Sequence, residues 1–444
     1  MTLFDLAGRG STPAAEVRGA VATFLTMSYI LFANPAILSA AGIPFAPAVA
    51  ATAAAAAVCS ILMGLVANVP IALAAGMGLN AVVAYQITPA AGSWQVAMGL
   101  VVLDGLIAFL LVLAGLREAI MTAIPMDLRR AIGVGIGLFL AFIGLVNAKI
   151  VIVPPGTLAA LSANPAAVMP PVTYGSFRAL EPLVALAGLL ITAVLVARRT
   201  TGAIVIGIIA STAFALVLGV TSLPEDGWIA VPSFETVGQA DVLGALTSSA
   251  LPLVLPLLLV DFFDTIGTIT AVTDEAGLQD REGRIPGVRR VLAVDSISAA
   301  IGGFFGVSSV TSYIESAAGT AEGARTGLHT VVVGLLFAAA IFLTPVFAIV
   351  PGAATAPALI AVGFLMCQQI TKIDFRQLDT AIPAFILLAT IPFTYSISHG
   401  IGFGFIAFVV IKVATGRWRE IRPLMYVAAL LFAVYFSMGS GSES

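Results

Sequence analysis

The chain has 444 residues, of which 60% are hydrophobic and 10% are charged. Soluble domains carry about 25% charged residues, so this composition excludes an ordinary water-soluble protein and predicts that most of the chain lies in lipid. The net charge of −3 gives no sign of a nucleic-acid partner. Cys59 and Cys367 lie in apolar runs and are interpreted as small buried side chains, and two histidines are too few to indicate a metal centre.

About fourteen apolar segments are long enough to cross a membrane, given that a helix needs about 20 apolar residues to span the hydrocarbon core. The candidates in the first half are residues 18–39, 47–68, 70–91, 94–114, 127–147, 181–197 and 202–220. The candidates in the second half are residues 248–272, 287–305, 307–322, 327–349, 354–371, 378–397 and 400–414. A further apolar stretch, residues 423–438, is short and either crosses the membrane or lies in its interface.

The charges in the connections predict the orientation of the spans. If the N-terminus lies in the cytoplasm, most arginines and lysines fall in cytoplasmic loops, and the outer loops hold few beyond Lys149 and Arg178. This distribution follows the positive-inside rule. Each half then holds about seven spans, and an odd number reverses the orientation of the second half, as in transporters with inverted repeats. Residues 221–247 are predicted to form an outer linker.

Glycine interrupts the third apolar segment of each half. The first segment is VPIALAAGMGLNAVVAY (Val69–Tyr85), and the second is GFFGVSSVTSYIESAAG (Gly303–Gly319). Both begin with strand-like sequence and continue with helix-like sequence. A broken helix leaves backbone groups that lipid cannot satisfy, and two such breaks at matching places indicate a site near the middle of the membrane. A packing kink in each segment is the alternative.

Three carboxylates lie inside the eighth and tenth apolar segments, and Asp104 is a lone acid in the fourth. Asp261 and Asp264 are three residues apart in the eighth span, so they share one helix face. Glu315 lies in the broken tenth span, and Asn80 lies at the equivalent place in the third. An aspartate at the centre of a membrane helix costs about 2.5–3.5 kcal/mol, so a cavity, polar partners or protons must accompany this set. Helix–helix hydrogen bonding by protonated acids is the alternative.

No lysine or arginine lies within the eighth or tenth span. Burial without a nearby cation favours the neutral acid, which permits proton exchange near neutral pH. We hypothesise that Asp264 exchanges this proton, while Glu315, favoured as an anion by a half-helix N-terminus, accepts hydrogen bonds from N–H groups of the cargo. With the amide of Asn80 and aromatic rings such as Phe263 and Tyr313, such a site suits a flat ring that carries both donors and acceptors.

Six long stretches, spread over nearly the whole chain, carry a family resemblance. They are TFLTMSYILFANPAILSAAGIP (Thr23–Pro44), GMGLNA (Gly76–Ala81), DLRRAIGVGIGLFLAFIGL (Asp127–Leu145), VDFFDTIGT (Val260–Thr268), TSYIESAAGTAEGARTGL (Thr311–Leu328) and IPFTYSISHGI (Ile391–Ile401). Together they resemble the adenine/guanine/hypoxanthine permeases, within the nucleobase–ascorbate transporter superfamily. Only SHG (Ser398–Gly400) departs from the residues expected there.

The resemblance implies an all-α polytopic membrane protein with about fourteen spans in two inverted repeats of seven. Spans 3 and 10 would each be a short strand followed by a half-helix. A core domain would comprise residues 1–116 (spans 1–4) and 248–350 (spans 8–11). A gate domain would comprise residues 117–220 (spans 5–7) and 351–444 (spans 12–14 and the last apolar segment), and residues 221–247 would be the linker.

The function implied by the resemblance is proton-coupled uptake of purine nucleobases by alternating access across the cytoplasmic membrane, with no cofactor besides the coupling proton. A homodimer through the gate domains is also implied. The family's cargo acids match Glu315 and, in the eighth span, Asp264, with Asp261 as a competitor. The candidate binding residues are Asp264, Glu315, Asn80, Asp261, Thr265, Ser312, Tyr313, Ser316, Thr26 and Phe263. The candidates for proton coupling are Asp264, Asp261 and Glu315.

Other functions remain open from the sequence alone. A uracil or xanthine transporter of the same fold is the nearest alternative. An anion carrier of related architecture is a further one, although carboxylates at the binding face count against it. A membrane enzyme is disfavoured, because the sequence shows no Ser/His/Asp, Cys/His or metal-ligand constellation.

Overall fold

The structure is a computed structural model that describes residues 4–116, 123–154, 156–157, 172–223, 227–247, 251–279, 285 and 287–439, without the side chains of Phe263, Ile266, Gly267, Met438 and Gly439. The helices of the first half are α1 (Pro13–Met27), α2 (Ile30–Ser39), α3 (Phe45–Val66), α4 (Met77–Val82), α5 (Thr88–Ala91), α6 (Trp94–Leu113), α8 (Met126–Asn147), α10 (Leu180–Ala197) and α11 (Ala203–Val217). The first half also holds β1 (Leu73–Ala75), a π-helical turn η1 (Val83–Ile87), β2 (Val151–Ile152) and β3 (Thr173–Tyr174).

The helices of the second half are α12 (Val242–Thr247), α13 (Val254–Glu275), α14 (Val288–Phe305), α15 (Ser316–Ala321), α16 (Gly327–Ala340), α17 (Thr344–Ala348), α18 (Gly352–Cys367), α19 (Leu378–Thr394), α20 (Ile397–Ala414) and α21 (Pro423–Gly439). This half also holds the strand β4 (Val310–Ser312) and the 3-10 turns η2 (Leu251–Leu253), η3 (Ile341–Leu343), η4 (Gln368–Lys372) and η5 (Trp418–Glu420).

The helices follow the apolar segments of the sequence closely, and the chain is a multi-pass membrane protein. Among the described residues, eight helical segments are long and apolar enough to cross a membrane, and four shorter apolar helices accompany them. The first predicted span divides into α1 and α2. The eighth begins at Val254, later than predicted, after the short turn η2. The total of about fourteen spans stays a prediction.

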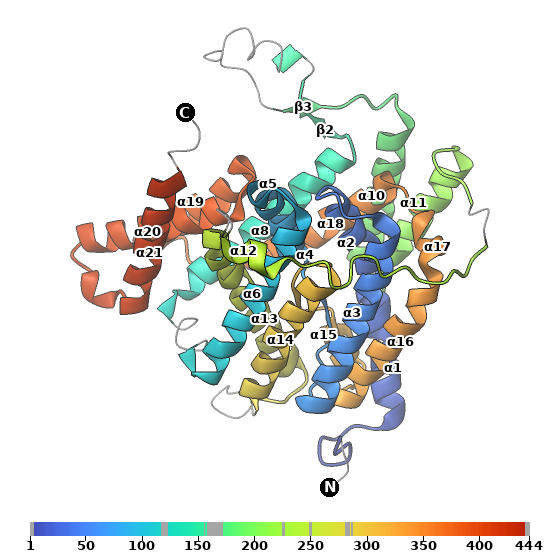
Figure 1. The fold of residues 1–444 in the computed structure, drawn as a ribbon, viewed down its shortest axis with the longest axis horizontal. Helices are drawn as coiled ribbons and strands as arrows, with labels where there is room; N and C mark the ends of the chain where they lie inside the picture. The colour runs from blue at the N-terminus through green and yellow to red at the C-terminus, as the bar shows by residue number, and fades with distance from the viewer. Residues whose placement is uncertain are drawn as a thin grey trace.

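The packing of the helices repeats itself between the two halves (Figure 1). The second span, α3, packs along the eleventh, α16, and the ninth span, α14, packs in the same way along the fourth, α6. The pair α10 and α11 has its counterpart in α19 and α20, and α8 packs along its counterpart α18. This correspondence is what two inverted repeats produce.

Two groups of helices pack mainly among themselves. In one group, α8, α10, α11, α18, α19 and α20 contact one another. In the other, α1, α3, α6, α13, α14, α15 and α16 surround the strands β1 and β4. The helix α21 packs on α20 at the side of the molecule (Figure 1). The assignment of these two groups to the gate and core domains stays a prediction.

The two broken spans meet through their strands, so the prediction that spans 3 and 10 are discontinuous is confirmed. β1 pairs antiparallel with β4, with Leu73 opposite Ser312 and Ala75 opposite Val310. Each strand leads into a half-helix, α4 after β1 and α15 after β4. Three-residue strands satisfy the backbone of each break, because each supplies the hydrogen bonds that the other lacks.

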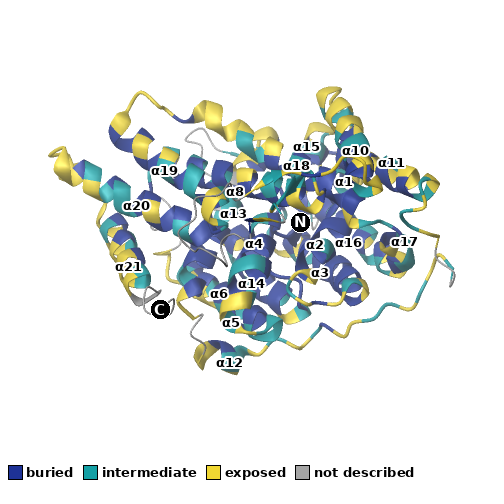
Figure 2. Ribbon diagram, turned by 90° about the horizontal axis from the view of Figure 1, so that it is seen from above, coloured by how far each residue is buried: buried dark blue, intermediate teal, exposed yellow. Residues whose placement is uncertain are grey.

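Exposed apolar side chains cover the outer helices. Figure 2 shows exposed residues along α10, α19, α20 and α21, whereas α3 and α18 are largely buried. Leu190, Val410 and Leu430 are each more than half exposed. Such a surface is suited to lipid rather than water.

Small residues let the helices approach closely, and one glycine tests this packing. A Cβ atom on Gly105 of α6 would lie 2.3 Å from the backbone nitrogen of Ala300 and 2.8 Å from the carbonyl oxygen of Ser296, both on α14. A Cβ atom on Gly133 of α8 would meet nothing within 4 Å.

Gly105→Ala is therefore expected to lower the thermal unfolding midpoint of the detergent-solubilised protein, because α6 and α14 must separate. The matched change Gly133→Ala should leave the midpoint unchanged or raise it, since alanine is the better helix former by about 0.5–1 kcal/mol. Equal midpoints for the two variants would contradict the close approach of α6 and α14.

Candidate functional site

The broken spans are held by side chains as well as by the strand pair. The hydroxyl of Ser316 accepts the backbone N–H of Ala72 at 3.0 Å, just before β1. The hydroxyl of Ser60, on α3, bonds both the N–H and the carbonyl oxygen of Leu73 at 2.9 and 3.0 Å. These bonds supply polar partners at a depth where lipid offers none.

Asp295 on α14 is the central anchor, and the sequence analysis did not single it out. Its Oδ1 accepts the backbone N–H of Ser312 at 3.0 Å and the Ser312 hydroxyl at 2.8 Å. Its Oδ2 accepts the hydroxyl of Thr265, on α13, at 2.7 Å. The residue is fully buried. Asp295 thereby joins α13, α14 and β4, and the presence of an acid inside an apolar span was the signal that could have found it.

Four of the candidate binding residues use their side chains to hydrogen-bond within the broken spans and their neighbours. Thr265 bonds Asp295, Ser312 bonds the same carboxylate, and Ser316 holds the chain before β1. The hydroxyl of Tyr313 donates to the carbonyl oxygen of Ala75. All four are buried, so in this structure their side chains hold the broken spans together.

Asn80 has a different environment. The side chain is fully buried in α4, and neither its amide nitrogen nor its amide oxygen has a hydrogen-bond partner among the described residues. A buried amide without partners is costly, so this position is suited to a ligand that both donates and accepts. The strand register also corrects one expectation: the residue equivalent to Glu315 in the first repeat is Gly78, because Asn80 stands two residues further along its half-helix.

Asp264 and Glu315 face the same region from α13 and from the start of α15. Glu315 precedes the first residue of α15, and its Oε1 accepts the hydroxyl of Tyr29 at 2.8 Å. Asp264 lies within electrostatic range of Glu315 and of Asp295. Both Asp264 and Glu315 are partly exposed rather than sealed. Two acids therefore remain accessible, and α13, which carries one of them, packs against α4, the helix of Asn80.

The other candidates lie around this group. Asp261 is fully buried, with the hydroxyl of Ser309 at 3.5 Å from its Oδ1. The Thr26 hydroxyl donates to the carbonyl oxygen of Thr23 at 2.8 Å and lies 3.5 Å from the carbonyl oxygen of Glu315. The side chain of Phe263 lies outside the described residues. Asp264 is thus better placed than Asp261 to meet a ligand.

A second set of polar contacts joins the first broken span to the last pair of spans. Gln86, in the π-helical turn η1, accepts the hydroxyls of Ser398 at 3.0 Å and Ser396 at 3.4 Å. The ring of Tyr85 packs edge-on against Tyr395 at 5.4 Å. Sequence reasoning missed this contact, because about 310 residues separate its two sides.

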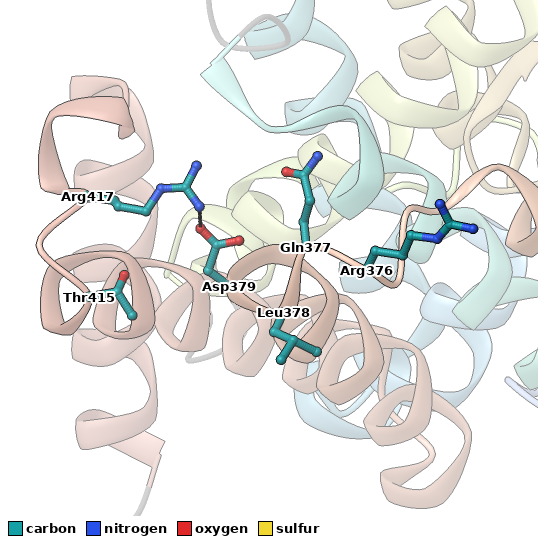
Figure 3. A pocket seen from close by; sticks show the side chains of 6 residues that line it. All are labelled: Arg376, Gln377, Leu378, Asp379, Thr415 and Arg417. Carbon is teal, nitrogen blue, oxygen red and sulfur yellow. Dashed lines mark hydrogen bonds and ion pairs between the residues drawn. The ribbon is translucent and has the colours of Figure 1, made fainter.

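A shallow, open pocket lies apart from the elements that carry these acids. It has a volume of about 610 Å³ and is lined by Arg376, Gln377, Leu378, Asp379, Thr415 and Arg417 (Figure 3). Beside it, Lys412 bridges Asp379 at 2.6 Å and Glu420 at 2.8 Å, and Arg417 pairs with the same two acids. Hydrogen bonds from Arg417 and Lys412 lower the pKa of Glu420 to about 2.

This ion-pair cluster joins the connections that flank α19 and α20. Asp379, which lines the pocket, and Glu420, which lies beside it, are both paired with cations. Among the described residues, the pocket therefore lacks buried polar groups without partners of the kind found at Asn80. We interpret the cluster as structural.

Comparisons with known proteins agree with this arrangement. The model of a family described as "Permease family" matches residues 14–403. An adenine permease of Escherichia coli is 40% identical over 433 residues, covering 97% of this chain and 94% of that protein. A guanine/hypoxanthine permease of Bacillus subtilis is 38% identical over 448 residues, covering 98% of this chain and 99% of that protein.

Solved structures show the same fold at low sequence identity. The transmembrane domain of a cyanobacterial bicarbonate transporter superposes with a TM-score of 0.61 at 16% identity, covering 88% of this chain and 97% of that one. A murine Solute Carrier 26 family A9 anion transporter, in its inward-facing state, superposes with a TM-score of 0.61 at 14% identity, covering 91% and 69%. These likenesses concern the fold alone.

The anchoring role of Asp295 predicts a large loss of stability in Asp295→Ala. Three buried donors would lose a charged acceptor, and hydrogen bonds to charged groups contribute about 1.5–3 kcal/mol each. The thermal midpoint should therefore fall sharply. Asp295→Asn keeps an oxygen that can accept the two bonds from Ser312, so its midpoint should lie between those of Asp295→Ala and the wild type. An unchanged midpoint for Asp295→Ala would contradict the anchor.

Proposed function

The chain belongs to the adenine/guanine/hypoxanthine permeases, and we propose that it carries purine nucleobases into the cell together with protons. It is a permease rather than an enzyme, and a small molecule and the lipid bilayer are its partners. The purine cargo follows the printed activities of relatives that match nearly the whole chain. The coupling to protons rests on the chemistry of the site.

One observation carries the cargo assignment: the buried amide of Asn80 has no hydrogen-bond partner among the described residues, and its helix α4 packs against α13, which carries the partly exposed Asp264 and contacts α15 next to Glu315. A purine edge alternates ring nitrogens, which accept hydrogen bonds, with N–H groups, which donate them. Asn80 can pair with both kinds of group, because its amide donates and accepts. Glu315 has one oxygen bonded to Tyr29, and we propose that its other oxygen accepts an N–H group of the base.

Asp264 is the proposed proton carrier. It lies within electrostatic range of two other acids, and no cation is paired with it among the described ion pairs. Mutual repulsion of carboxylates favours a proton on one of them. Asp264 would hold that proton while the base is bound and release it in the cytoplasm. Asp261 is less suited to releasing a proton, since its fully buried side chain has no contact with solvent in this structure, whereas Asp264 is partly exposed.

Movement between the two groups of helices would expose the site alternately to each side. The contact of Gln86 with Ser396 and Ser398 crosses between these groups. These hydrogen bonds of Gln86 must break whenever the two groups of helices separate next to Gln86. The core domain thus comprises the helices around β1 and β4, and the gate domain comprises the helices around α8 and α18. Association of two copies through their gate domains completes the proposal.

The proposed location is the cytoplasmic membrane, with the N-terminus inside the cell. Arg9 near the N-terminus bonds the carbonyl oxygens of Asn68 and Arg325, so three connections predicted as cytoplasmic lie together. Arg130 likewise bonds the carbonyl oxygen of Lys372, in another connection predicted as cytoplasmic. Arg289 bonds the carbonyl oxygen of Leu113, at the predicted cytoplasmic end of the fourth span. Basic residues gathered at one end support that end as the cytoplasmic one.

Transport by proteoliposomes tests the coupling. Tritiated adenine, guanine or hypoxanthine should accumulate when the lumen is alkaline relative to the medium, and a proton ionophore should abolish the accumulation. Unlabelled uracil, xanthine and bicarbonate serve as competitors. Accumulation that survives the ionophore would remove proton coupling, and competition by uracil or xanthine alone would favour the other cargo class of this fold.

The role of Glu315 predicts that Glu315→Gln loses binding of all three purine bases. The amide presents an N–H donor or a weaker acceptor where the cargo needs a carboxylate, so affinity should fall at least about 100-fold, or about 2.7 kcal/mol. Glu322→Gln is the matched control, because Glu322 is an exposed partner of Arg18 at the end of α15. Wild-type affinity in Glu315→Gln would refute the assignment.

A further inference from the structure

Tyr29 stands at the break in the first span. It lies between the end of α1 and the start of α2, and its side chain is almost completely buried. Its hydroxyl donates a hydrogen bond to Oε1 of Glu315 at 2.8 Å. A phenol on one broken element thus reaches the carboxylate on another, across 286 residues of sequence.

The packing of α1 against α15 fixes this contact. A Cβ atom on Gly319 would lie 2.7 Å from the carbonyl oxygen of Gly19 and 2.4 Å from the hydroxyl of Thr23. The hydroxyl of Thr23 in turn lies 2.9 Å from Nε2 of His329, on α16. Because α1 and α15 touch without room for a methyl group, the two helices are held at a fixed separation next to the contact of Tyr29 with Glu315.

The groups facing Glu315 include no cation among the described ion pairs. Tyr29 approaches from the break between α1 and α2, Tyr313 from the residue after β4, and Asp264 from α13. His329 of α16 lies against Thr23 and Gly319, further along α1 and α15. Tyr29 is therefore the neutral donor that stabilises Glu315 as an anion, where an arginine or lysine would serve in an ordinary ion pair.

We propose that Tyr29 is a positioning residue for cargo binding: its hydroxyl holds one oxygen of Glu315 and directs the other oxygen to the base. The inference rests on the proposed function, since it concerns how Glu315 meets a purine. A hydrogen bond to the charged form of an acid favours ionisation. Tyr29 thereby sets how acidic the medium can become before Glu315 takes up a proton and releases the base.

This role predicts a specific change in Tyr29→Phe. Without the phenol, Glu315 ionises less readily, so the acid side of the binding–pH profile should move to higher pH by about one unit, equivalent to about tenfold weaker binding there. At higher pH the carboxylate forms without help, and the affinities of variant and wild type should converge. The alkaline side, which Asp264 sets under the proposed function, should stay in place.

The experiment measures equilibrium binding of tritiated adenine, guanine and hypoxanthine to the purified full-length protein in lipid nanodiscs, from about pH 4.5 to about pH 9. Tyr426→Phe is the matched control, because the Tyr426 hydroxyl bonds the carbonyl oxygen of Trp418 far from the acids. It should reproduce the wild-type profile. If Tyr29→Phe does not fold, 3-fluorotyrosine at position 29 keeps the ring, strengthens the donor and should move the acid side to lower pH.

The outcomes separate this inference from the function on which it rests. A shifted acid side in Tyr29→Phe, with recovery at high pH, supports the positioning role. An unshifted profile, or equal weakening at every pH, overturns it and assigns Tyr29 to packing or to stacking on the base. If the wild type binds none of the three bases, the proposed function fails and this inference fails with it.

Discussion

The antiparallel pair of β1 and β4 is the constraint on which the site depends. Two interrupted spans can lie in a membrane only if their free backbone groups find partners, and here each three-residue strand supplies partners for the other. Because the strands run antiparallel, the half-helices α4 and α15 begin at opposite ends of the strand pair and run away from each other. α4 carries Asn80, Glu315 precedes α15, and α13, which contacts both half-helices, adds Asp264.

The pairing divides the polar residues of the region into two classes. Asp295, Ser312 and Thr265 form a closed network of hydrogen bonds around the strands. Asn80 has no hydrogen-bond partner among the residues that the structure describes, and Glu315 has one oxygen bonded to Tyr29. Polar groups that satisfy one another stabilise a membrane protein, whereas those left unsatisfied call for a ligand. In our account the same break in the helices creates both the framework and the binding surface.

The sequence predicted where the apolar helices lie, because lipid imposes a length and an apolar composition on each span, while the total of about fourteen spans stays a prediction. The glycines and hydroxyl residues of spans 3 and 10 also predicted the breaks. The division of roles could not be predicted: Ser312 and Ser316 were expected to meet the cargo, yet the Ser312 hydroxyl donates to the carboxylate of Asp295 and the Ser316 hydroxyl accepts the backbone N–H of Ala72. The roles of Asp295 and Tyr29 depend on hydrogen-bond partners that are distant in sequence, Thr265 and Ser312 for Asp295 and Glu315 for Tyr29. The sequence analysis paired Asn80 with Glu315 as equivalent residues of the two repeats, but the counterpart of Glu315 is Gly78, two residues earlier. Only the strand pairing defines these equivalent positions.

A structure of the protein with a bound purine base would test the central claim most directly. We expect a map from cryo-electron microscopy to show the base between α4, α13 and α15, with one N–H group within hydrogen-bonding distance of Glu315 and its edge paired with the amide of Asn80. The strands β1 and β4 should remain paired. Density for the base at any place where neither Asn80 nor Glu315 contacts it would contradict the account.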